Sequence, residues 1–140
     1  MKLLKFKTSI NASKEKVWST LWNDTTYRQW TSAFTTGSHA VSDWNEGSKI
    51  NFLDGNGSGM FSIIDKKVEN QQMIFKHLGD IVNGTEVITE WSGAKENYLL
   101  SENNGVTELT VTLDTADEYV SYMTDSFPKA LALLKEITEK

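Results

Sequence analysis

Residues 120–137, VSYMTDSFPKALALLKEI, decide the fold because they predict one long helix near the end of the chain. Apolar side chains recur there at spacings of three and four, the period of a helix with one buried face. The stripe keeps its phase across Pro128, the only proline, so we expect one bent helix over 116–139. Its members are Val120, Met123, Phe127, Ala130, Leu131, Leu134 and Ile137.

Upstream of this helix, from about residue 38, the apolar period changes to two and predicts a run of strands. The glycine-rich stretch 54–59 and the pairs Asn83-Gly84 and Asn104-Gly105 suit tight turns between strands. Consecutive hairpins indicate an antiparallel sheet. The expected strands lie near residues 38–44, 48–53, 59–69, 72–79, 85–92, 95–102 and 106–114.

The start of the chain supplies one more strand and two short helices. Residues 2–10 alternate lysine with apolar side chains, which is typical of a half-buried strand. Short helices follow at about 13–22, with Ser13 as N-cap, and at 24–30. This order predicts a single α+β domain, residues 1–140, with the last helix covering the apolar face of the sheet. Such an arrangement often encloses a cavity, which favours small-molecule binding.

The composition argues against several classes of binding partner. The 140 residues carry a formal charge of −5 with scattered basic residues, and nucleic-acid or anionic-membrane binding normally needs a concentrated basic face. No cysteine is present, which excludes disulfides, thiolate ligands and a cysteine nucleophile. Residues 1–10 do not read as a signal peptide, so we expect a cytoplasmic protein.

Four stretches give the chain a resemblance to a known family. It resembles the START-like (Bet v 1-like, polyketide cyclase) superfamily and, within it, the activator of Hsp90 ATPase homologue 1-like (AHSA1) family. The match covers essentially the whole chain and depends on the order and spacing of its motifs. They are INASKEKVW at 10–18 followed by Leu21, YRQW at 27–30, DWNEGS at 43–48 and FPKALALLK at 127–135.

The resemblance implies a helix-grip fold, in which a curved antiparallel sheet of about six to seven strands wraps around the last helix and leaves a cavity. Some members bind hydrophobic ligands, some are cyclases or hydrolases, and the eukaryotic members stimulate a chaperone ATPase. Those activators carry a preceding second domain that these residues do not show, which disfavours co-chaperone activity. An NTF2-like cone is the alternative fold, but it places its long helix first.

Aromatic side chains supply most candidates for the cavity wall, and His77 would be a polar tip among them. A pocket of aromatic rings with a few polar groups suits a flat apolar ligand. Core packing is the competing role for each ring. The candidate ligand-binding residues are Trp30, Phe34, Trp44, Phe52, Phe75, His77, Trp91, Tyr98, Tyr122, Met123 and Phe127.

The sequence therefore favours a protein that binds a small hydrophobic or aromatic ligand. No catalytic residue, metal site or cofactor is predicted, because no motif for one is present. A cyclase, dehydratase or hydrolase is the first alternative, and it would use His77, Tyr98 and Glu90. A chaperone-interacting module is the second alternative, and it would need an exposed patch near Trp44 and Trp91.

Overall fold

The computed structural model describes residues 1–140. Its helices are α1 (Lys14–Trp22), α2 (Asp24–Thr31) and α3 (Val120–Glu139), the last preceded by the single 3-10 turn η1 (Asp117–Tyr119). Its strands are β1 (Lys2–Ile10), β2 (His39–Val41), β3 (Lys49–Leu53), β4 (Gly59–Val68), β5 (Gln72–Val82), β6 (Thr85–Ile88), β7 (Lys95–Asn103) and β8 (Val106–Thr115).

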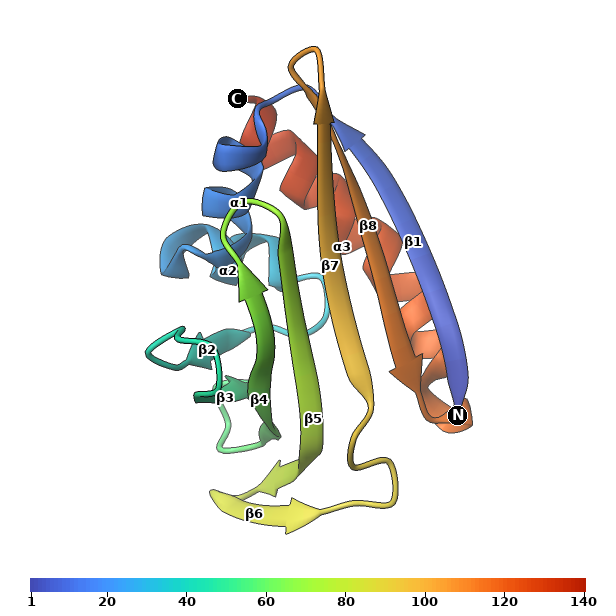
Figure 1. The fold of residues 1–140 in the computed structure, drawn as a ribbon. Helices are drawn as coiled ribbons and strands as arrows, with labels where there is room; N and C mark the ends of the chain where they lie inside the picture. Colours follow the sequence, from blue (N-terminus) through green and yellow to red (C-terminus); the bar gives the residue numbers. More distant parts are fainter.

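All eight strands form one antiparallel sheet in the order β1-β8-β7-β5-β4-β3-β2, with β6 attached to β5. The sheet curves around α3, and α1 and α2 pack on the same side of the sheet as α3 (Figure 1). The first strand pairs with the last over its whole length, from Lys2 opposite Thr115 to Ile10 opposite Thr107. The predicted helix-grip architecture is confirmed.

Local sequence explains the turns and one helix start. Asn83-Gly84 and Asn104-Gly105 both adopt positive φ at both positions, which is the geometry of the tight turn that the sequence predicts. Ser13 caps α1, because its Oγ accepts the backbone N–H of Lys16 at 3.2 Å.

The C-terminal part of α3 is firmly embedded in the core. Phe127, Ala130, Leu131 and Leu134 are each at most 3% exposed. The Phe127 ring stacks on Phe6 of β1 with centroids 5.0 Å apart. Pro128 lies inside the helix, as expected from the unbroken apolar stripe. Packing of this face, rather than local propensity, therefore holds the helix together across its proline.

An aromatic cluster fills the space between α1, α2 and the sheet, and Trp22 is its centre. The Trp22 ring contacts Tyr98 at 4.9 Å, Phe75 at 5.3 Å and Trp44 at 5.7 Å between centroids. Most of these pairs are edge-on, the arrangement that ring quadrupoles favour. The space between α1, α2 and the sheet is consequently part of the hydrophobic core.

Apart from shifts of one residue, four predicted boundaries differ from the structure. The strand expected over 72–79 continues to Val82, because its end pairs with β6. The strand expected over 85–92 ends at Ile88, because residues 89–94 form a loop that follows the edge of β5 and bonds to both backbone groups of His77. The strand expected over 38–44 is only His39–Val41, since Trp44 takes a left-handed φ of 64°. The helix expected from 116 begins at Val120, after the 3-10 turn.

None of the helices combines the length and the hydropathy that crossing a membrane requires.

Candidate ligand-binding pocket

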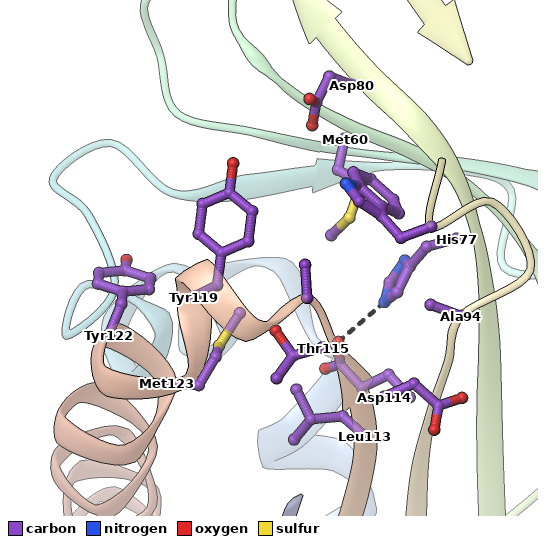
Figure 2. A pocket seen from close by; sticks show the side chains of 13 residues that line it. Met60, His77, Asp80, Ala94, Leu113, Asp114, Thr115, Tyr119, Tyr122 and Met123 are labelled. Carbon is purple, nitrogen blue, oxygen red and sulfur yellow. Dashed lines mark hydrogen bonds and ion pairs between the residues drawn. The ribbon is translucent and has the colours of Figure 1, made fainter. Parts of the chain in front are cut away.

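A pocket of about 260 Å³ lies at the N-terminal end of α3, where the helix stands away from the sheet. Its walls come from five places: β4, β5, the loop before β7, β7 itself, and the segment from the end of β8 into α3. Figure 2 shows Tyr119, Tyr122 and Met123 on one side, and His77, Met60 and Ala94 on the other. We call this the main pocket.

The pocket exists because α3 is packed unevenly along its length. The residues from Phe127 onwards that face the sheet are buried, whereas Tyr119 and Tyr122 are each 44% exposed. The apolar stripe thus grips the sheet only in the C-terminal part of the helix. The side chains of the first turns line the main pocket without filling it.

A bulge in β5 brings a second polar residue to the pocket side of the sheet. Ser62 pairs with His77 and Phe61 pairs with Gly79, so Leu78 has no partner in β4. One unpaired residue reverses the alternation of side chains along a strand. His77 and Asp80 therefore both line the main pocket although they are three residues apart.

Four polar side chains form a hydrogen-bonded chain, and two of them, His77 and Glu96, line the main pocket. Ser62 Oγ lies 2.6 Å from His77 Nδ1, and His77 Nε2 lies 3.1 Å from Glu96 Oε1, the contact drawn as a dashed line from His77 in Figure 2. The Tyr98 hydroxyl donates to the other Glu96 oxygen. A neutral His77 that donates from Nε2 accepts the Ser62 hydroxyl at Nδ1. The chain thus satisfies its buried members and leaves Glu96 at the pocket surface.

Glu96 changes the chemistry of two tyrosines. Burial raises the pKa of Tyr98 well above its usual value, and the negative charge of Glu96 raises it further. Burial and the same charge also raise the pKa of Tyr27. Both phenols are therefore held in the protonated form that can donate a hydrogen bond.

This predicts a loss of stability at alkaline pH. The folded-state pKa values of Tyr27 and Tyr98 lie above the ordinary value of 10.0, so the unfolded chain releases these protons first. The free energy of unfolding should be unaffected by these groups below pH 10 and fall as the pH rises above it. Tyrosinate absorbance followed alongside circular dichroism should show these two phenols ionising only with unfolding. In Glu96→Gln the Tyr98 pKa should fall, and an unchanged value would contradict the role of the carboxylate.

A second hollow of about 170 Å³ adjoins the main pocket. The two share Met60, Glu96, Tyr122 and Met123 as wall residues, so these side chains separate them. The second hollow reaches towards the core, with Trp30, Tyr98 and Phe127 at its base. We call it the adjoining hollow.

Nine of the eleven residues predicted from the sequence line these two spaces. His77 and Trp91 line the main pocket, and Tyr122 and Met123 line both. Trp44 and Phe75 line neither, because their rings pack in the aromatic cluster around Trp22. The adjoining hollow takes the remaining five, Trp30, Phe34, Phe52, Tyr98 and Phe127.

The sequence prediction chose the wrong glutamate as the polar partner of His77. Glu90 is exposed and lines neither space, whereas Glu96 bonds to His77. Glu96 lies on the same face of β7 as the buried Tyr98 and Leu100, and a charged residue on this apolar face was the available signal. Asp80 carried no such signal, because only the bulge at Leu78 turns it inward. No three His, Asp or Glu side chains gather as a metal site.

The curved sheet, the long last helix and the pocket between them define a helix-grip domain of the START-like class. A model of the family described as "Activator of Hsp90 ATPase homolog 1-like protein" matches residues 11–139. The chain belongs to this family. A search of curated protein sequences gives no match.

Solved structures of similar fold span the whole chain. The Aha1 dimer from Colwellia psychrerythraea is 22% identical with a TM-score of 0.77, covering 99% of this chain and 97% of that one. A solution structure from Cytophaga hutchinsonii is 23% identical with a TM-score of 0.72, covering 99% and 94%. DynU16, from the dynemicin biosynthetic locus, is 14% identical with a TM-score of 0.74, covering 100% of this chain and 48% of that one. These likenesses establish the fold.

Proposed function

We propose that this protein binds a small ligand with an apolar or aromatic body in the main pocket. The observation that supports it most directly is the unfilled space at the open end of α3, with apolar walls above a satisfied polar chain. Binding sites of this kind combine apolar surface with a few fixed polar groups. Membership of a family with a ligand-binding fold, and the likeness to a protein of a biosynthetic locus, support the same reading.

The volume sets the size of the ligand. About 260 Å³ lies just under the usual range of roughly 300–1,000 Å³ for ligand pockets, so the ligand is small. The adjoining hollow offers about 170 Å³ more if Met60 or Met123 changes rotamer. Methionine side chains adapt readily in this way.

Native mass spectrometry of the purified protein tests the proposal first, followed by a fragment screen by NMR. Shifts should concentrate on residues that line the main pocket. Met123→Trp fills the space and should weaken binding by at least about tenfold. Leu99→Trp adds the same ring on the outer face of β7, where Leu99 is 44% exposed, and should leave binding unchanged. Equal loss in both variants, or shifts elsewhere, would contradict the proposal.

A second candidate function, proton-transfer catalysis in the same pocket, is favoured by the chain from Ser62 through His77 to Glu96. A carboxylate coupled to a buried histidine is a usual arrangement for a general base. Small ketones in deuterium oxide test it, because a base at this position would exchange their α-hydrogens. Exchange that Glu96→Gln abolishes would support catalysis. Exchange no faster than in buffer would contradict catalysis and leave ligand binding as the proposed function.

Interaction with a chaperone remains the other prediction from the family. The rings expected to form its surface are both half-buried, Trp44 against Trp22 and Trp91 in the pocket wall. Neither ring is freely exposed, so we rank this function third.

A further inference from the structure

The main pocket has an unbalanced set of charges. Three acidic residues, Asp80, Glu96 and Asp114, are among its 13 wall residues, and no lysine or arginine is. His77 is the only basic side chain there, and its Nε2 is already bonded to Glu96. The acidic side chains of the pocket wall therefore outnumber its basic ones.

Two of these carboxylates belong to the pocket side of the sheet. Glu96 is opposite the buried Leu113 on β8, and it accepts from His77 and Tyr98. Asp80 is opposite Met60, another wall residue. Asp114 alternates with Leu113 and Thr115, both buried, so its carboxylate is on the outer face and accepts the backbone N–H of Lys95.

No lysine neutralises the two inner carboxylates. Lys95 pairs with Asp65 and Lys49 pairs with Glu86. Asp80 makes no ion pair or side-chain hydrogen bond within the chain, and its carboxylate stands at the rim of the pocket beside Met60 (Figure 2). An unpaired carboxylate at a half-enclosed site with apolar walls favours a cation.

Aromatic rings complete this environment. Trp91, Tyr119 and Tyr122 line the pocket, and Figure 2 places Tyr119 and Tyr122 on the helix side, across from His77. The face of an aromatic ring attracts an ammonium group, and Trp and Tyr attract it best. Rings on one side and carboxylates on the other are what an organic cation requires. A bare metal ion would need a cluster of ligands that the chain does not form.

We propose that the ligand of the main pocket is an organic amine with an apolar body. Its ammonium group lies between Asp80 and the Tyr119 ring, within the field of Glu96, and its body lies against Met60, Leu113 and Met123. Anionic ligands of the same shape are rejected. This inference depends on the proposed binding function. The following experiment gives different results if only this inference fails and if the binding function fails.

The experiment uses three arylalkyl skeletons, phenethyl, naphthylmethyl and indolylethyl, each as amine, alcohol and carboxylate. Kd values come from NMR titration of the intact protein at neutral pH. For at least one skeleton the amine should bind at least about tenfold more tightly than the alcohol, with the carboxylate weakest. Asp80→Asn should remove most of this preference. Asp125→Asn is the matched control, because Asp125 is exposed on α3 and lines neither space, and it should preserve the preference.

The outcomes are distinguishable. Alcohols or carboxylates that bind as tightly as the amines would overturn the charge assignment and leave the binding function standing. A preference for amines that survives in Asp80→Asn would overturn the placement of the ammonium group. Absence of binding by all nine compounds would overturn both this inference and the proposed function.

Discussion

Replacing Phe127 with alanine should lower the free energy of unfolding by about 3–5 kcal/mol. Phe127 is 2% exposed, stacks on Phe6 at 5.0 Å and meets Phe34 edge-on at 4.9 Å. Removing the ring leaves a void between α3, β1 and the segment after α2, and the sheet that curves around it cannot collapse to fill it. Chemical denaturation of the variant and the parent protein measures the difference.

The control for this variant is Leu99→Ala on the outer face of β7, where the side chain is 44% exposed. It should change stability by no more than about 0.5 kcal/mol. A loss in Phe127→Ala no greater than in this control would mean that α3 does not hold the sheet through its aromatic contact.

Replacing Gly79 with alanine should detach β6 from β5. A Cβ at this position would be 2.1 Å from the carbonyl oxygen of Val87 and 2.9 Å from the Ile88 Cα, and backbone atoms cannot yield as a flexible side chain can. Relief requires β6 to move away, at a cost of about 1–3 kcal/mol. Hydrogen exchange should show lost protection in β6 and at the end of β5, while β7 and β8 keep theirs.

Ser92→Ala, an exposed change in the loop after β6, is the control and should leave exchange unaltered. Because Gly79 adjoins the unpaired Leu78, Gly79→Ala should also disturb Asp80 and weaken any ligand of the main pocket. Full protection of β6 in Gly79→Ala would contradict the close approach that the structure shows.

The strands and helices were predictable where one physical signal dominated. Alternation marked β1, paired Asn-Gly residues marked the turns, and the unbroken stripe across Pro128 marked α3 as one helix. These features are local, so a short stretch of sequence is enough to predict each of them.

The site was predictable only in part, because its polar members depend on pairing between distant strands. The aromatic walls follow from helix and strand faces, and most of the predicted rings line the two spaces. The place of Asp80 depends on one unpaired residue in β5, which no local pattern reports. Trp44 failed as a wall residue because its left-handed backbone turns the ring into the cluster around Trp22.

The pairing of the first strand with the last has a consequence for biosynthesis. Ile10 of β1 needs Thr107 of β8, which a ribosome working at roughly 5–20 residues per second delivers about 5–20 s later. During that interval the nascent chain carries an unpaired strand with an apolar face. Such a strand can pair with another chain and cause aggregation. Lys5 and Lys7 alternate with its apolar side chains and are exposed in the folded protein. Charges at such positions oppose pairing between chains, so we expect these two lysines to limit aggregation until β8 is made.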